Sequence, residues 1–243
     1  MFTTALFPKK TALYLTAFTV SALISHGQLN DDFDSYTLNS NIDSQGGWST
    51  AGDNEDTSLT ISNTYAQSGT QSLFIVDDSN SQLPRATYTF DAPITQGQFT
   101  FSVREDQADS AAEDHWAIKF GGFRFSRFSG KLALKYEGGD TTNTTIGSTS
   151  YSTSDWNNFS ILFDGTTGAA SVSLGGTTII TADNPTYTWS SSYVELGTYS
   201  SSNDTDAVYF DTISMTTIPE PASMAGLIGL TALGLSLFRR KRA

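Results

Sequence analysis

The sequence has no cysteine, only two histidines and only thirteen lysine and arginine residues among its 243 residues. Without cysteine, the chain forms no disulfide bond and holds no zinc or redox site that needs a thiolate. A histidine-rich metal site is excluded as well. His115 is the one histidine outside the N-terminal segment, and in a strand it would point to the face opposite Trp116. We therefore expect it to be an ordinary strand residue on the outer face.

Positive charge is scarcest in the middle of the chain. Residues 28–218 hold seven basic and 24 acidic residues, which gives a net charge of −17. Such a surface repels nucleic acid and anionic lipid, so we expect no nucleic-acid partner. It suits a protein that stays soluble outside the cell, or one that gathers divalent cations.

Long apolar runs are confined to the two ends of the chain. Near the N-terminus, a dibasic pair precedes the uncharged run 11–24, and the small residues Ser25 and Gly27 follow it. This order is typical of a secretory signal peptide, and fourteen residues are too few to span a membrane comfortably. We expect residues 1–27 to form a signal helix that signal peptidase removes after Gly27, which indicates an exported protein.

The C-terminal run, residues 222–238, is also free of charge. As a helix rising 1.5 Å per residue it would be about 25 Å long, which is just enough to cross a bilayer. Four cations close the chain, and the positive-inside rule keeps them in the cytoplasm with the body outside. These cations are Arg239, Arg240, Lys241 and Arg242.

Directly before this run, Glu220 lies between Pro219 and Pro221. Proline disfavours helix, so this stretch should be extended and accessible to a processing enzyme. With the apolar run and the basic end, residues 218–243 resemble the PEP-CTERM sorting signal of bacterial exopolysaccharide-associated proteins. The resemblance implies recognition by exosortase, an intermediate tethered to the inner membrane, and a final place at the cell surface or in the extracellular matrix. The alternative is an ordinary single-pass membrane anchor.

Between the two ends, apolar and polar residues alternate in short stretches. Examples are GQFTFSVR (97–104), HWAIKF (115–120) and KLALKYE (131–137), and glycine-containing turns separate many of these stretches. A period of two with glycine turns is typical of antiparallel strands joined by hairpins. Ten or more such strands predict an all-β fold for residues 28–217, either a sandwich or a barrel.

Three stretches favour the sandwich by resemblance to a known family. WNNFSILFDGTTGAASVSLGGTTI (156–179) is similar to the hairpin pair of laminin-G-like, concanavalin-type jelly rolls. AVYFDTISM (207–215) resembles the last strand of these domains, and DDFDSY (31–36) with GGWS (46–49) resembles the first. The resemblance implies an antiparallel jelly-roll β-sandwich and does not carry the family's ligand chemistry with it.

Catalytic motifs are missing from the sequence. The G-x-S-x-G motif does not occur, nor does the E-x-D-x-x-E spacing of hydrolases that share this fold. We therefore expect a non-catalytic protein that is adhesive or binds carbohydrate, such as an extracellular polysaccharide. A hydrolase or lyase that acts on extracellular polysaccharide remains an alternative, and so does a purely structural component of a biofilm or coat.

Clustered aspartates indicate a structural calcium ion as the one expected cofactor. The first and last strands of a jelly roll commonly pair, which would bring Asp32 or Asp34 close to Asp211. Calcium takes six to eight oxygen ligands, and these carboxylates would supply some of them. The alternative is that they are solvated loop residues.

Most basic residues of the body fall between positions 119 and 135. Four of them alternate with apolar residues and should form a basic band on the outer face of a three-stranded meander, residues 115–137. The band either holds an anionic polysaccharide or pairs with the protein's own carboxylates. Arg127 breaks the alternation, since it shares the parity of Phe123 and Phe125. The four residues are Lys119, Arg124, Lys131 and Lys135.

Two aromatic residues near the end of the body, Tyr187 and Trp189, share a strand face. Exposed rings of this kind stack on sugars, whereas buried rings belong to the core. Both interpretations stay open at this point.

Overall fold

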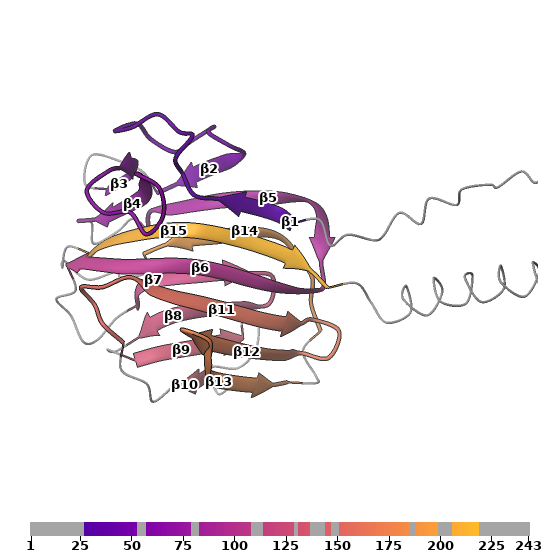
Figure 1. Ribbon diagram of the computed structural model, residues 1–243. Helices are drawn as coiled ribbons and strands as arrows, with labels where there is room; N and C mark the ends of the chain where they lie inside the picture. Colours follow the sequence, from indigo (N-terminus) through magenta and orange to yellow (C-terminus); the bar gives the residue numbers. More distant parts are fainter. Residues whose placement is uncertain are drawn as a thin grey trace, which may run out of the picture.

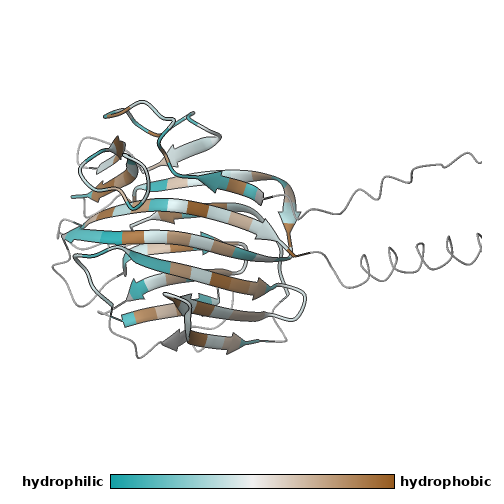
Figure 2. Ribbon diagram, in the orientation of Figure 1, coloured by the Kyte–Doolittle hydropathy of each residue, from teal (hydrophilic) through white to brown (hydrophobic). Residues whose placement is uncertain are grey.

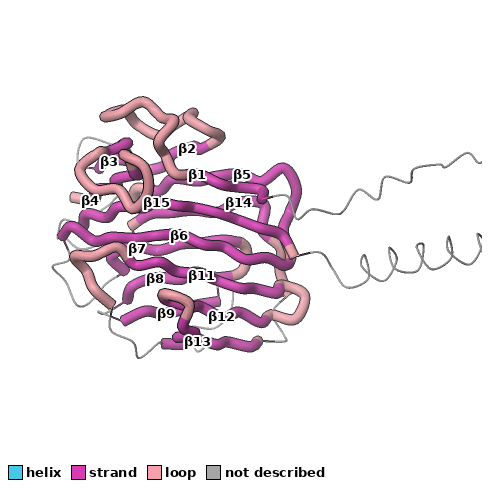
Figure 3. The backbone as a smooth tube through the Cα atoms, viewed as in Figure 1, coloured by secondary structure: helices cyan, strands magenta, loops and turns pink. Residues whose placement is uncertain are grey.

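The computed structural model describes residues 27–52, 57–78, 83–107, 114–128, 131–136, 144–146, 151–184, 188–198 and 206–218. In these ranges all regular structure is β-strand, as Figure 3 shows. None of the described segments forms a helix that would cross a membrane. The predicted signal helix and the predicted membrane helix, residues 222–238, lie outside the described residues.

One of the two antiparallel sheets has eight strands. They are β1 (Gly27–Asp31), β3 (Thr57–Ser62), β4 (Ser72–Asp77), β6 (Gln96–Gln107), β11 (Asn157–Asp164), β12 (Ala169–Leu174), β13 (Thr177–Asp183) and β15 (Asp206–Thr217). Their order is β13-β12-β11-β6-β15-β4-β3, and β1 also pairs with β15. Figure 1 shows this sheet facing the viewer.

The other sheet has seven strands and lies behind the first in Figure 1. They are β2 (Trp48–Ala51), β5 (Arg85–Ile94), β7 (Asp114–Phe120), β8 (Phe123–Phe128), β9 (Lys131–Tyr136), β10 (Thr144–Ile146) and β14 (Ser191–Gly197). Their order is β10-β9-β8-β7-β14-β5-β2. The predicted meander is confirmed, because β7, β8 and β9 are consecutive neighbours.

The predicted all-β antiparallel sandwich is confirmed. The expected pairing of the first and last strands is also present, with Asp31 opposite Ile213 and Gly27 opposite Thr216. The beginning of β1 and the end of β15 therefore lie side by side, at one end of the sandwich (Figure 1).

The core fills the space between the sheets with aromatic side chains. Each strand sends every second residue inward, and hydropathy alternates along the strands in Figure 2. Phe101 on β6 stacks on Phe159 of β11 with ring centroids 5.3 Å apart. Trp116 and Phe125, from the opposite sheet, contact each other edge to face at 5.5 Å. Ring pairs in these geometries stabilise a core beyond the effect of their buried area.

A buried charged group interrupts this apolar core. Glu105 follows the inward-facing residues of β6 and is only 3% exposed. Its Oε1 accepts a hydrogen bond from Trp116 Nε1 at 2.7 Å and another from the Tyr151 hydroxyl, and its Oε2 forms an ion pair with Arg127. The inward parity of Arg127, visible in the sequence, thus has a structural explanation.

Burial raises the pKa of Glu105, while the positive charge of Arg127 and the hydrogen bond from Trp116 act in the opposite direction. A carboxylate removed from water is tolerated only when charge and hydrogen bonds compensate it. Arg127 therefore serves the stability of the core, which agrees with its exclusion from the predicted basic band.

His115 lies next to this group, and its predicted place on the outer face is wrong. The residue is 3% exposed, and its Nδ1 lies 2.6 Å from Oδ1 of Asp206 on β15. The register between β7 and β8 shifts between Asp114 and Ala117. This irregularity interrupts the simple alternation, so that His115 and Trp116 are both buried.

We predict that Arg127→Met lowers the free energy of unfolding by about 3 to 5 kcal/mol at pH 8, because it leaves a buried carboxylate without its cation. The loss should be smaller at pH 5. Without Arg127, the pKa of Glu105 rises further above its unfolded value, so protonation relieves the defect at low pH and the defect appears in full as pH rises. Urea unfolding at both pH values measures the difference.

The double variant Glu105→Gln/Arg127→Met is the matched control, since a neutral amide needs no cation. It should be more stable than Arg127→Met alone at pH 8. An equal loss of stability for Arg127→Met at pH 5 and pH 8 would contradict this account of the buried pair.

Candidate functional site

The outer face of the seven-stranded sheet carries a row of basic residues in direct register. Lys119 on β7 is the partner of Arg124 on β8, and Arg124 is the partner of Lys135 on β9. Neighbouring strands lie about 4.8 Å apart, so the three cations follow one another at that spacing across the sheet. We call Lys119, Arg124 and Lys135 the basic row.

Lys131, the fourth residue of the predicted band, lies outside this row. It pairs with Phe128 at the start of β9, four residues from Lys135 on the same face. Four residues along a strand are about 13 Å. The structure therefore brings three of the four predicted cations together.

Glu195 on β14 continues the row on the other side of Lys119, its register partner. The same carboxylate lies 3.9 Å from the guanidinium of Arg85. One end of the row thus borders the protein's own negative charge, whereas Arg124 and Lys135 lie one and two strands farther from Glu195. Self-pairing, the alternative left open by the sequence, therefore stays open for the row.

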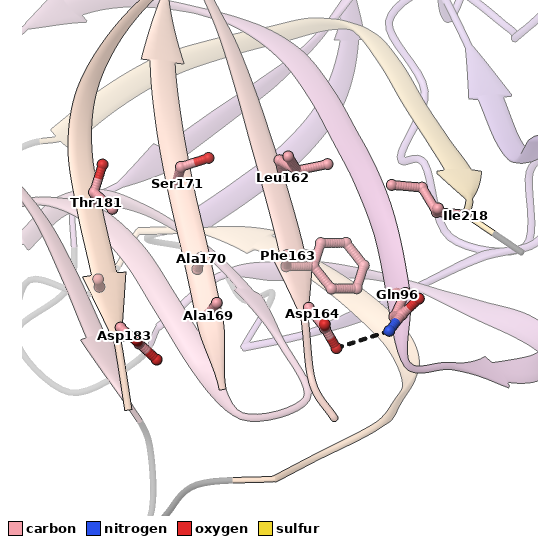
Figure 4. Close-up of a pocket in the computed structure, with 11 residues that line it drawn as sticks. Gln96, Leu162, Phe163, Asp164, Ala169, Ala170, Ser171, Thr181, Asp183 and Ile218 are labelled. Atoms are coloured by element: carbon pink, nitrogen blue, oxygen red, sulfur yellow. Dashed lines mark hydrogen bonds between the residues drawn. The ribbon is translucent and has the colours of Figure 1, made fainter. Parts of the chain in front are cut away.

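The eight-stranded sheet carries an open groove of about 450 Å³ on its outer face (Figure 4). Its floor consists of two adjacent rows across β11, β12 and β13. Gln96 of β6 and Ile218, which follows β15, line one side. The rows are Leu162–Ser171–Thr181 and Asp164–Ala169–Asp183.

This groove combines apolar surface with carboxylates. Leu162 is 47% exposed and Ile218 is 43% exposed, which is unusual among the large apolar side chains that the structure describes. Asp164 and Asp183 flank the small side chain of Ala169 and lie two strands apart, or about 10 Å. The groove therefore offers an apolar patch with hydrogen-bond acceptors along one edge.

Asp164 is held in place by the turn that follows β11. Its Oδ1 accepts hydrogen bonds from Gln96 Nε2 and from the backbone N–H of Thr166, both at 2.9 Å. Burial alone would raise the pKa of Asp164, but the hydrogen bonds from Thr166, Gln96 and Thr167 outweigh it and lower the pKa to about 2. The carboxylate is therefore ionised at neutral pH and is unsuited to act as a general acid.

The carboxyl groups whose pKa is raised by burial lie elsewhere. Glu105 is nine residues along β6 from Gln96, or about 30 Å, and is enclosed in the core. Asp211 lies on β15 and is fully buried. Neither side chain lines the groove.

The aspartates predicted to bind calcium tie a loop to the eight-stranded sheet. Asp34 Oδ1 accepts backbone N–H groups of the loop before β4, at 2.8 and 2.9 Å. Asp211 Oδ2 accepts two more, from Gln67 and Ser68, at 2.7 and 2.9 Å. Burial raises the pKa of Asp211, and the nearby charge of Asp32 adds to this effect.

In the part of the chain that the structure describes, no three acidic or histidine side chains gather closely enough to hold a metal ion. The carboxylates of Asp34 and Asp211 are instead directed at backbone donors. Calcium at Asp32, Asp34 and Asp211 stays a prediction.

Trp189 is partly buried at the edge of the core. Its ring stacks on Phe163 with centroids 5.2 Å apart and meets Phe123 edge to face at 5.1 Å. It covers the turn after β7, where Gly121 has a φ of +51° and an added Cβ would lie 2.6 Å from the indole. This placement favours core packing over sugar stacking for Trp189, and Tyr187 lies outside the described residues.

The residues predicted for sorting lie outside the described part of the chain, and they stay predictions. They are Pro219, Glu220, Pro221, Arg239, Arg240, Lys241 and Arg242. Gly27 is the first residue of β1, so cleavage after it would begin the mature chain within that strand.

The groove was missed at the level of sequence. The alternation in 157–164 and 169–183 places Leu162, Asp164 and Thr181 on outer faces, but it does not show which strands are neighbours. Only the register of β11, β12 and β13 brings these side chains together.

No protein-family model and no curated protein sequence matches the chain. Several solved structures are similar to it. The cellulose-induced protein Cip1 is 20% identical, with a TM-score of 0.61 over 78% of this chain and 97% of that one. A conserved carbohydrate esterase from the Shiga toxin-encoding bacteriophage phi24B is 11% identical, with a TM-score of 0.55 over 79% of this chain and 100% of the esterase.

Botulinum neurotoxin type C, whose cell entry depends on interaction with two ganglioside molecules, is 13% identical with a TM-score of 0.55. The match covers 86% of this chain and 52% of the toxin chain, so this chain spans about half of that structure. At these identities the similarity concerns the fold alone. The chain therefore shares the jelly-roll β-sandwich fold of these proteins.

Proposed function

We propose that the chain is an exported, non-catalytic protein of the cell surface or extracellular matrix whose jelly-roll domain binds carbohydrate. The groove on the eight-stranded sheet is the observation that carries this proposal. A sugar ring has an apolar face of C–H groups and a rim of hydroxyl groups, and the groove offers partners for both.

Leu162 and Ile218 supply the apolar surface on which a ring would lie. Asp164 and Asp183 supply acceptors for hydroxyl donors, and the methyl group of Ala169 between them leaves room for the ring. A volume of about 450 Å³ is within the usual range of small-ligand sites. Because the described residues that line the groove include two carboxylates and no cation, it favours a neutral sugar over an acidic one.

The fold supports the same proposal by analogy. Among the structurally similar proteins, one is a carbohydrate esterase and another interacts with gangliosides, which are glycolipids. Fold analogy does not transfer a ligand, so the identity of the sugar depends on the groove and not on these neighbours.

Binding without catalysis is favoured by the state of the groove carboxylates. Glycoside hydrolysis needs a protonated carboxyl group opposite an ionised one. Asp164 stays ionised, and Glu105 and Asp211, the described carboxyl groups whose pKa is raised by burial, lie outside the groove. A hydrolase or lyase remains the alternative function, and release of shorter products from a polysaccharide would identify it.

The sequence signals at the two ends support the proposed route of export. Signal peptidase would cleave after Gly27, and the membrane helix 222–238 would hold the body outside until exosortase recognises the stretch from Pro219 to Pro221. Gly27 pairs with Thr216, so the first described residue of the body lies beside its last strand. This proximity supports a route in which both ends are processed at the same membrane.

We expect intact-mass measurement of the protein released from cells to show a chain that begins near Gln28 and ends near Pro221. The cell-associated intermediate should retain residues 222–243. Detection of the full C-terminal run in the released protein would contradict processing by exosortase and would favour the ordinary membrane anchor.

We predict that Leu162→Asp weakens binding of a neutral oligosaccharide at least tenfold, which corresponds to about 1.4 kcal/mol, because it removes the apolar platform. The probes are hexasaccharides of the cellulose, xylan, mannan and laminarin types, titrated calorimetrically into the purified protein. Leu38→Asp is the matched control, since Leu38 is similarly exposed, at 38%, and does not line the groove.

Binding that is equally strong in Leu162→Asp and in Leu38→Asp would remove the groove from the proposal. Failure of the unmodified protein to bind any of the four neutral probes or an acidic polysaccharide would favour the purely structural role. Shortened products after incubation would favour the enzyme.

A further inference from the structure

We propose that the basic row is a second binding site, which takes a linear polysaccharide carrying one carboxylate on each sugar. The row lies on the outer face of the seven-stranded sheet, and the groove lies on the outer face of the opposite sheet. The two sites face away from each other, so one domain could hold a neutral and an acidic polymer at the same time and link them.

The row concentrates positive charge that is scarce elsewhere in the body. Lys119, Arg124 and Lys135 occupy successive partner positions on three neighbouring strands, although residues 28–218 contain only seven basic residues. An anionic ligand that follows the row meets all three charges at once.

The spacing of the row fits a polysaccharide chain that runs across the strands. Neighbouring cations are about 4.8 Å apart along the row, which is close to the length of one pyranose unit in an extended glycan. Because successive sugars of such a chain are rotated about its axis, a polymer with a carboxylate on every sugar is needed to bring more than one of them to the three cations. Arg124 in the middle offers a planar pair of donors suited to a carboxylate, and the two lysines offer point charges.

The surroundings limit where the polymer would lie. Two residues along each strand from the basic row, a parallel row of small side chains faces outward and is fully buried. It consists of Ala117, Ser126 and Ala133. The three residues of the basic row are themselves partly exposed, and so is Tyr193 on β14, two residues from Glu195. A tyrosine ring at this edge offers a surface for a sugar ring and a hydroxyl group for hydrogen bonding.

The charge of the whole body selects among polyanions. Duplex DNA carries one negative charge per about 1.7 Å and contacts a protein over a wide surface. A body with a net charge of −17 repels such a partner outside the row. A polymer with one charge per sugar needs only the narrow band that Lys119, Arg124 and Lys135 provide.

The basic row already has interaction partners within the protein, and a ligand would compete with them. Glu195 borders Lys119 and is shared with Arg85. A ligand would therefore exchange part of this internal pairing for its own carboxylates. Binding through exchange of exposed ion pairs is sensitive to salt.

The test uses the purified protein with polygalacturonate as the acidic probe, dextran as a neutral polymer and duplex DNA as a competing polyanion. We expect polygalacturonate to bind, with an affinity that falls as salt concentration rises. The variant Arg124→Glu/Lys135→Glu should bind at least tenfold more weakly. Arg124→Gln/Lys135→Gln, which removes charge without reversing it, should show a smaller loss in the same direction.

Lys131→Glu is the matched control, because it makes the same charge change on the same strand and face, about 13 Å from Lys135. It should lower the affinity less than threefold. Each variant must melt within a few degrees of the unmodified protein and keep any binding to the neutral probes of the groove, which separates loss of this site from loss of the fold or of the proposed function.

Three results would overturn the proposal. The first is no binding of polygalacturonate by the unmodified protein at low salt. The second is an equal loss of affinity in Lys131→Glu and in the double charge reversal, which would reduce the effect to overall charge. The third is tighter binding of duplex DNA than of polygalacturonate at the same salt concentration, which would assign the row to nucleic acid.

Discussion

Strand β15 is the element on which the eight-stranded sheet depends, because it is hydrogen bonded to three other strands. One of its edges pairs with β6 along most of its length, and the other edge pairs first with β4 and then with β1. At the change from β4 to β1 the register shifts between Asp211 and Ser214, and Thr212 has a φ of +51°. The Asp211 carboxylate at this point binds backbone N–H groups of Gln67, Ser68 and Thr212, and so fixes the irregular turn of the chain.

The alternation of side chains along the strands explains both the core and the two candidate sites. On β11, Phe163 points into the core, while its neighbours Leu162 and Asp164 form part of the groove. On β8, Phe125 lies in the core, and Arg124 next to it belongs to the basic row. The same pleat that packs the aromatic core therefore fixes the basic row and most of the groove. Ile218, which follows β15, and the turn that holds Asp164 complete the groove.

The fold could be predicted from the sequence because its main signal is local. A period of two, glycine turns and the resemblance of the final strand to jelly-roll domains were sufficient for an antiparallel sandwich. The outward parity of Lys119, Arg124 and Lys135 could also be read directly. That these three residues share one row, and that Lys131 does not, depends on the register between strands, which the sequence does not contain.

The wrong position expected for His115 and the unrecognised partner of Glu105 have a common physical origin. His115 was expected outside, but a β-bulge breaks the alternation at the start of β7 and the side chain bonds Asp206 in the interior. Glu105 continues the inward positions of Phe101 and Val103, so its burial was readable, but its partner Arg127 is distant in sequence. Long-range pairing decides both cases, and local patterns do not report it.

The arrangement of the two sites on opposite faces is the central claim, and NMR mapping of the protein with a neutral hexasaccharide and with oligogalacturonate tests it most directly. The account predicts that the neutral sugar shifts backbone amides around Leu162 and Ser171, and that the acidic sugar shifts those around Arg124 and Lys135. Both sets should appear unchanged when the two ligands are present together. Shifts from both ligands on one face, or competition between them, would contradict the account.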